Sequence, residues 1–127
     1  MVIFTIKKLS EFSLPKFNQH AIQIAISTIT LTELIFGVGK SANPTKNLAT
    51  VLNFVSRLTI IPYDEQAAFH YGNIRAILEK QGQRIGDNDL HIAGHARSKG
   101  LIVVTNNTRE FNRVDGLRVE DWTKESE

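Results

Sequence analysis

Short apolar runs alternate along this chain with longer segments in which apolar residues recur at helical spacing. The runs predict strands at 2–6, 22–27, 59–62, 101–105 and 117–120, the last of them at a sheet edge. Helices are predicted over 28–39, 44–58, 64–82 and 88–99. A continuous apolar strand such as 101–105 is typical of a parallel sheet that is covered on both faces. The alternation therefore predicts an α/β fold class, with a mostly parallel central sheet flanked by helices on both faces.

The sequence also predicts how the helices are capped and how two of them pack. Ser27 or Thr28, and Asp64, are expected to cap the helices that follow them, because their short side chains can accept from free backbone N–H groups. The helix over 44–58 is expected to have one apolar face, made of Leu48, Val51, Leu52, Val55 and Leu58. The helix over 88–99 carries three small residues, Ala93, Gly94 and Ala96. We expect these small residues to let that helix pack close to the sheet.

The length of 127 residues fits one domain, predicted over residues 1–122, followed by a flexible tail at 123–127. No apolar run approaches the roughly 20 residues of a membrane span. Lysines follow the apolar start, which is the reverse of a signal peptide, so we expect a cytoplasmic protein without a membrane partner. The absence of cysteine excludes disulfides, thiolate nucleophiles and cysteine-bound zinc. A net charge of +2 permits a polyanionic partner without requiring one.

Several common catalytic patterns are missing or incomplete. The segment GVGKS at 37–41 ends a predicted helix and lacks the spacing of a phosphate-binding loop, and no serine lies in a nucleophile-elbow pattern. His91 and His95 stand at the i, i+4 spacing by which two imidazoles can hold zinc. Ile92 occupies the position of a metalloprotease glutamate, and a third ligand would have to come from elsewhere. We therefore favour two histidines that are hydrogen-bonded at a helix surface or interface, with structural zinc as the alternative.

The acidic residues are more informative. Asp87 and Asp89 fall at the start of a predicted helix, where the backbone N–H groups favour negative charge, and one of them or Asn88 would suffice as a cap. Glu33 lies near the start of its own helix, off the apolar stripe. Each acid alone is more simply structural. If they converge at the carboxyl ends of the strands, they repel one another unless a cation such as Mg²⁺ or Mn²⁺ lies between them. Such a site would hydrolyse a phosphodiester.

Three segments carry a family resemblance. They are ISTITLTELIFGVGKS (26–41), IGDNDLHIAGHARSKGLIVVTNNTREF (85–111) and GLRVEDW (116–122). Over nearly its whole length the chain resembles the VapC toxins, which are the PIN-domain ribonucleases of bacterial toxin–antitoxin pairs. The resemblance implies a PIN-like domain that cleaves RNA with Mg²⁺ or Mn²⁺ held by acidic residues.

The motifs of the resembled family give roles to individual residues. The glutamate of the TxxEL pattern falls on Glu33, and the aspartate before xxIA falls on Asp89. The VTxNxxDF segment falls on Thr105, Asn107 and Glu110. The implied catalytic residues are Glu33, Asp89 and Asn107. The implied metal ligands are Glu33, Asp89 and Glu110, with Asp87 as an auxiliary acid.

The resemblance also implies partners. The substrate is expected to be a structured RNA, commonly a tRNA, and the chain to form a homodimer neutralised by a VapB-type antitoxin. Operator DNA would be met only through that antitoxin. Candidates for contact with the RNA backbone are Lys7, Lys8, Arg84, Lys99 and Arg109, although scattered basic residues often serve only solubility.

One segment of the family pattern is missing from the 127 residues. VapC proteins begin with a strand ending in LDTN, whose aspartate is a central metal ligand, and an apolar stretch similar to VIFTIK follows it. Here Met1 stands directly before Val2, which implies a truncated first strand. Two explanations stay open: the natural protein is longer, or the gene has lost the strand. Because losing a carboxylate weakens metal binding, the alternative to a ribonuclease is an impaired binding module that still dimerises and binds antitoxin.

Overall fold

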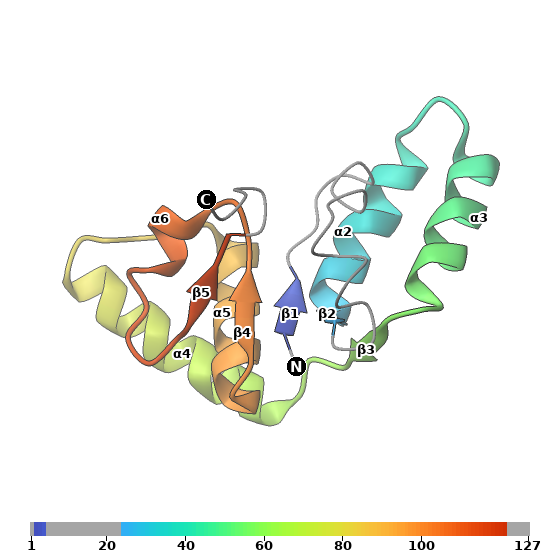
Figure 1. Ribbon diagram of the computed structural model, residues 1–127. Coiled ribbons are helices and arrows are strands. Elements are labelled where there is room, and N and C mark those ends of the chain that lie inside the picture. Colours follow the sequence, from blue (N-terminus) through green and yellow to red (C-terminus); the bar gives the residue numbers. More distant parts are fainter. Residues whose placement is uncertain (1, 5–23, 122–127) are drawn as a thin grey trace, which may run out of the picture.

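The computed structural model describes residues 2–4 and 24–121, arranged as a parallel sheet between helices (Figure 1). The strands are β1 (Val2–Phe4), β2 (Ile24–Ser27), β3 (Thr59–Ile61), β4 (Ile102–Val104) and β5 (Val119–Glu120). The helices are α2 (Thr28–Gly39), α3 (Pro44–Val55), α4 (Glu65–Lys80), α5 (Asp87–Lys99) and α6 (Thr108–Phe111). The predicted α/β class is confirmed, whereas the short helix α6 was not predicted. The tail at 123–127 lies outside the described residues.

The sheet has the strand order β3-β2-β1-β4-β5, and each neighbouring pair runs parallel. The short strand β1 is central, between β2 and β4, and β5 lies at an edge as predicted. Because every strand runs the same way, the carboxyl ends of β1, β2 and β4 meet at one edge of the sheet. None of the helices in the described part of the chain has the length and apolar character needed to cross a membrane.

Two of the predicted helix caps are confirmed and a third is wrong. The Ser27 hydroxyl accepts from the backbone N–H of Ile29 at 3.1 Å, and the Asp64 carboxylate accepts from that of Ala67 at 3.0 Å. Helix α5 instead begins at Asp87, with Gly86 as N-cap and no side-chain cap. The helix starts one residue earlier than predicted. Asp87 and Asp89 in its first turn are hydrogen-bonded to Tyr71 and Asn107.

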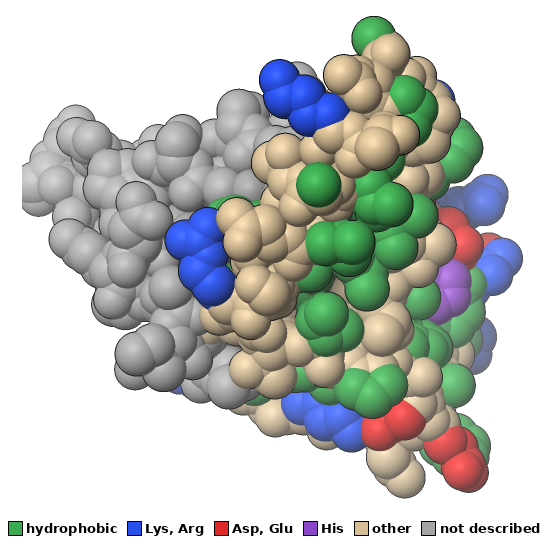
Figure 2. Space-filling view, turned by 90° about the vertical axis from the view of Figure 1, so that its right-hand side faces the viewer, with side chains coloured by type: hydrophobic (Ala, Val, Ile, Leu, Met, Phe, Trp, Pro, Cys, Tyr) green, Lys and Arg blue, Asp and Glu red, His purple; other side chains and the backbone are tan. Residues whose placement is uncertain are grey.

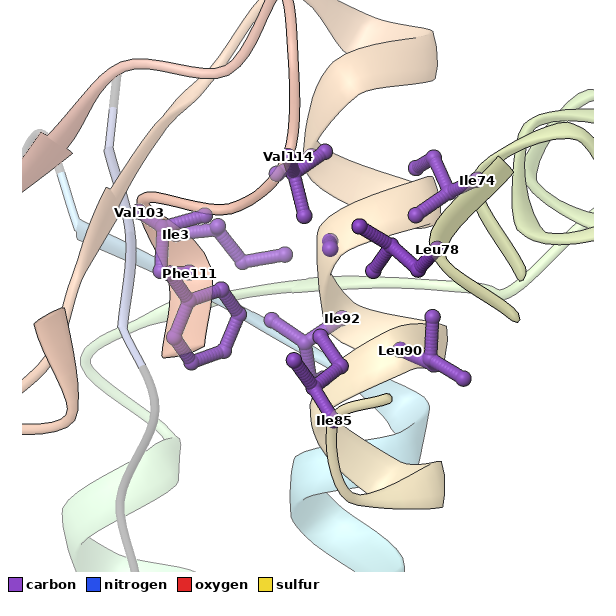
Figure 3. Close-up of a cluster of buried hydrophobic side chains, with 11 residues drawn as sticks. Ile3, Ile74, Leu78, Ile85, Leu90, Ile92, Val103, Phe111 and Val114 are labelled. Atoms are coloured by element: carbon purple, nitrogen blue, oxygen red, sulfur yellow. The ribbon is translucent and has the colours of Figure 1, made fainter. Parts of the chain in front are cut away.

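Strand alternation gives the sheet two different faces. Ile24, Ile26 and Val104 face a core that is completed by buried residues of α2 and α3. Ile3 and Val103 face the opposite core, which is larger and is shown in Figure 3. That core contains buried side chains from α4, α5, α6 and the loops beside them, among them Ile74, Leu78, Ile85, Leu90, Ile92, Phe111 and Val114. The helix pair α4–α5 therefore covers one face of the sheet, and the pair α2–α3 covers the other.

The apolar face of α3 is buried only in part. Val51 and Val55 are buried, but Leu48 is 38% exposed and Leu52 is 50% exposed. In Figure 1, α3 lies beyond α2 at the margin of the molecule, so only one line of its apolar side chains reaches the core. Figure 2 shows apolar side chains gathered on this side of the molecule. The predicted apolar face is therefore present, but only part of it packs into the core.

The small residues of α5 serve a different contact from the one expected. A Cβ atom added at Gly94 would lie 2.8 Å from the backbone nitrogen of Tyr71 and 3.1 Å from the carbonyl oxygen of Ala67, both on α4. Gly94 thus allows close backbone approach between two helices, and the expectation that it faces the sheet is wrong. Ala93 and Ala96 are fully buried in the core beside the sheet, as predicted.

Candidate active site at the start of helix α5

Asp89 lies in the first turn of α5, and only 8% of its surface is exposed. Its Oδ2 atom accepts a hydrogen bond of 2.9 Å from Nδ2 of Asn107, a residue that follows β4. The same Asn107 nitrogen donates to Oε2 of Glu110 at 2.8 Å. The Asn107 backbone is held in turn by the hydroxyl of buried Thr105, which accepts from its N–H at 3.0 Å. One amide therefore brings two carboxylates together at the carboxyl end of the sheet.

Hydrogen bonds keep the Glu110 carboxylate in its charged form. The bond from Asn107 is the largest cause of a lowered Glu110 pKa, and it outweighs the opposing effect of burial. The Glu110 carboxylate is also stabilised in its charged form by a hydrogen bond accepted from the Asp89 carboxyl and by one accepted from the backbone N–H of Gly86. Charged carboxylate oxygens beside an amide oxygen are hard donors of the kind preferred by Mg²⁺ and Mn²⁺. The donor chemistry of Asp89, Asn107 and Glu110 therefore fits such a cation.

Glu33 reaches the same region from α2. Its side chain is exposed, and its Oε1 atom accepts a hydrogen bond from Nδ2 of Asn88 in the first turn of α5. Sequence reasoning treated Asn88 only as a possible cap and missed this contact. The position of Asn88 between two acids was the one available signal, since its partner lies 55 residues away along the chain.

Asp87 is directed away from the other acids. Its Oδ1 atom accepts a hydrogen bond of 2.8 Å from the Tyr71 hydroxyl on α4. Of the four predicted metal ligands, the structure thus joins Asp89 with Glu110 and links Glu33 to Asn88, the residue before Asp89. Across residues 2–4 and 24–121, no three histidine or acidic side chains come together as a metal-binding group.

The predicted RNA-contacting residues are spread over the molecule. Arg84 precedes α5, and Arg109 lies next to Glu110 on α6, and both are exposed. Lys99 ends α5 and pairs with Asp64, with Nζ and Oδ2 2.6 Å apart. Helix α5 has 13 residues and is about 20 Å long. Lys99 is therefore far from the acids at the start of the helix. Lys7 and Lys8 lie outside the described residues.

The two histidines of α5 have separate environments. His95 is fully buried, with Nδ1 2.8 Å from the Ser27 hydroxyl, and burial is the largest cause of its lowered pKa. His91 is half-buried and stacks on Tyr71 at a centroid distance of 4.3 Å. The edge of the Tyr63 ring meets both imidazoles. His95 is thus a core residue and not a surface one as expected, and among the described residues no third ligand completes a zinc site.

Comparisons of this chain with known sequences and with known structures agree with one another. A family model described as the PIN domain matches residues 3–117. The ribonuclease VapC2 of Haemophilus influenzae is 52% identical over 96% of this chain and 92% of its own length. The tRNA(fMet)-specific endonuclease VapC of Salmonella typhimurium is 53% identical over 94% of this chain and 91% of its own length. The crystal structure of DNA-bound VapBC from Salmonella typhimurium matches with a TM-score of 0.87 and 45% identity, over 96% of this chain and 98% of that one.

Proposed function

The chain belongs to the VapC family of PIN-domain proteins, and from that membership we propose that it is the metal-dependent endoribonuclease toxin of a type II toxin–antitoxin pair. The observation that carries the proposal is the pair Asp89 and Glu110, joined by Asn107 where the strands end. A structured RNA is the proposed substrate. A tRNA is favoured because a relative 53% identical is named a tRNA(fMet)-specific endonuclease.

Each residue of the site has its own role in the proposed reaction. Asp89 and Glu110 would hold Mg²⁺ or Mn²⁺, which when bound supplies a Lewis acid and a more acidic water. Asn107 donates to both carboxylates through one amide, so they would present oxygens in fixed positions to that cation. Glu33 is oriented by Asn88 and extends the acidic surface toward α2. Cation binding requires a charged carboxylate, and the lowered pKa of Glu110 keeps its side chain charged to a more acidic pH than an ordinary glutamate.

Substitution of Asp89 tests this proposal directly. Asp89→Asn keeps the size of the side chain but removes its charge, so we expect metal-dependent cleavage of a cellular tRNA pool to fall by about 100-fold or more. The measurement is cleavage by the purified chain with Mn²⁺ and with EDTA. Asp115→Asn changes an exposed acid in the loop before β5 and serves as the matched control. Equal cleavage by Asp89→Asn and wild type, or cleavage that EDTA leaves unchanged, would contradict the proposal.

A second candidate is a binding module that does not cleave RNA. Two observations favour it: Val2–Phe4 of the central strand carry no carboxylate, and the acids of the described region do not form a group of three. This candidate predicts that the purified chain leaves the tRNA pool intact with Mn²⁺ while it still binds its antitoxin. Metal-dependent cleavage that Asp89→Asn abolishes rules it out.

We propose a VapB-type antitoxin as the protein partner, because the matched structures from Salmonella typhimurium and Rickettsia felis are VapBC assemblies bound to DNA. Contact with operator DNA is proposed to run through that antitoxin. A homodimer in the cytoplasm completes the proposal. The half-exposed apolar side chains of α2 and α3, including Ile35 and Leu52, are consistent with a chain that works in an assembly.

A further inference from the structure

A cavity of about 90 Å³ lies on the α4 side of the acid pair. Three elements surround it: the second half of α4, the loop before α5, and the first turn of α5. Its lining residues are Arg75, Leu78, Glu79, Arg84, Ile85, Asp87 and Leu90. Leu78, Ile85 and Leu90 are buried and form an apolar floor, whereas the four charged side chains form an exposed rim.

The rim is held in place by a chain of contacts. The Tyr71 hydroxyl donates to Oδ1 of Asp87 at 2.8 Å and accepts from Nη1 of Arg75 at 2.9 Å. Nε of Arg75 lies 3.5 Å from Oε2 of Glu79. These contacts fix the Asp87 carboxylate while 68% of its side chain stays exposed. Arg84 is a second cation in the lining of the cavity, on the loop that ends at Gly86.

This combination of an apolar floor and a charged rim suits a flat heterocycle with a polar edge. The volume equals about three water molecules at roughly 30 Å³ each. It is well below the roughly 300 Å³ at which pockets begin to hold whole ligands. The cavity therefore accepts the edge of one base and not a complete nucleotide. Unpaired bases of RNA are commonly recognised in this way, by their polar edges in a protein pocket.

We propose that this cavity binds the edge of one unpaired guanine of the RNA substrate, and the identity of the ligand as RNA rests on the proposed function. Guanine presents N1–H and N2–H side by side, which a carboxylate such as Asp87 can accept together. It also presents O6 and N7 as adjacent acceptors, which match the donor fork of an arginine such as Arg84. Adenine and cytosine place an acceptor where guanine carries N1–H, so the carboxylate disfavours them.

The cavity and the acid pair lie on different sides of the same helix start. Asp87 and Asp89 lie in the same turn of α5, and the Gly86 backbone N–H bonds Glu110 on the catalytic side. A base held by Asp87 would thus lie around the start of α5 from the acid pair, within reach of the same RNA strand. The cavity would then select a nucleotide at a set distance from the cleaved bond, which makes Asp87 and Arg84 specificity-determining residues.

Binding is tested first, without any cleavage. Amide resonances of the ¹⁵N-labelled full chain are followed during titration with guanosine, adenosine, cytidine and uridine monophosphates. We expect shifts at residues 84–87 with guanosine monophosphate, and binding about 5- to 150-fold tighter than that of the other three, as for one bidentate base contact. Asp87→Asn should abolish the preference, and Asp115→Asn should keep it. Equal binding of all four nucleotides, or shifts confined to other regions, would overturn the proposal.

Cleavage specificity is the second test. The 5′ ends of cut tRNA are sequenced, and wild type should cut at a fixed distance from a guanine. In Arg84→Gln that preference should weaken, whereas in Arg118→Gln, an exposed arginine outside the cavity, it should persist. Cutting that ignores the neighbouring base overturns the guanine subsite and leaves the nuclease proposal intact. A chain that binds guanosine monophosphate at 84–87 but cuts no RNA supports the subsite and contradicts the nuclease proposal.

Discussion

The helix pair α4–α5 and the helix pair α2–α3 cover opposite faces of one sheet, yet they pack in different ways. At Gly94 the backbones of α4 and α5 approach so closely that a Cβ atom would meet Tyr71 at 2.8 Å. On the other face, α3 leaves Leu52 half exposed and α2 leaves Phe36 65% exposed. The closely packed pair holds Asp89, Asp87 and the cavity beside them. Both faces leave apolar side chains exposed, since Phe69 of α4 is also 65% exposed. The difference between the two pairs therefore lies in how closely the helix backbones approach each other.

Truncation of one leucine on each face should give the largest difference. Leu78 on α4 is 2% exposed and Leu52 on α3 is 50% exposed. Leu78→Ala should lower the free energy of unfolding by about 2–5 kcal/mol, because it removes buried contacts and leaves a cavity. Leu52→Ala should cost less than about 1 kcal/mol, because water already reaches that side chain. Urea denaturation of both variants measures the difference, and equal losses would show that the two faces are packed alike.

A glycine pair provides the next test. Gly94→Ala should lower the free energy of unfolding by about 1–3 kcal/mol, since the new Cβ atom meets helix backbone that cannot move aside. Gly37→Ala on α2, where nothing lies within 4 Å of the new atom, should raise it by about 0.5–1 kcal/mol through helix propensity. Opposite signs in thermal denaturation are the expected result. A loss at both positions would mean that the contrast between the faces is smaller than the contacts indicate.

The contrast between the faces was not visible in the sequence, although the elements themselves were. Apolar runs such as 101–105 predicted the strands, because burial between two layers of helices requires apolar residues at every position. Helical spacing also predicted the apolar face of α3, but spacing does not reveal what a face packs against. Leu52 and Val55 fit the same pattern, and only Val55 is buried. Gly94 was recognised as a site of close packing, but its partner proved to be α4.

The candidate site was predicted in part. Family motifs selected Asp89, Asn107 and Glu110, and the structure brings these three together. Asp87 was grouped with them by its position in the sequence, but residues two apart on a helix point about 200° apart, so it faces Tyr71. The contact of Asn88 with Glu33 depends on how α2 and α5 are placed in space. Local periodicity carries no information about such a contact.

His95 links the two helix pairs. His95 lies on α5, and its Nδ1 atom lies 2.8 Å from Ser27, which caps α2. Burial lowers the His95 pKa, an effect that nearby Lys99 reinforces and Asp64 opposes. The unfolded chain, in which histidine has its ordinary pKa of about 6.5, therefore binds more protons than the folded chain as the pH falls below about 7. The stability contributed by neutral His95 should accordingly be lost as the pH falls through this range.

Comparison with His95→Asn isolates this effect, because the asparagine amide can still meet Ser27 but does not titrate. We expect wild type to lose more stability than His95→Asn when urea denaturation is measured at pH 7.0 and again at pH 5.5. The other histidines are common to both proteins, and the lowered pKa values of Asp64 and Glu110 act at more acidic pH. Parallel pH dependences would mean that His95 takes up a proton in the folded chain as readily as in the unfolded one. In that case, the folded chain would have to let water reach His95 at the junction between α5 and α2. The closely packed helix pair would then be more accessible at this point than its contacts indicate.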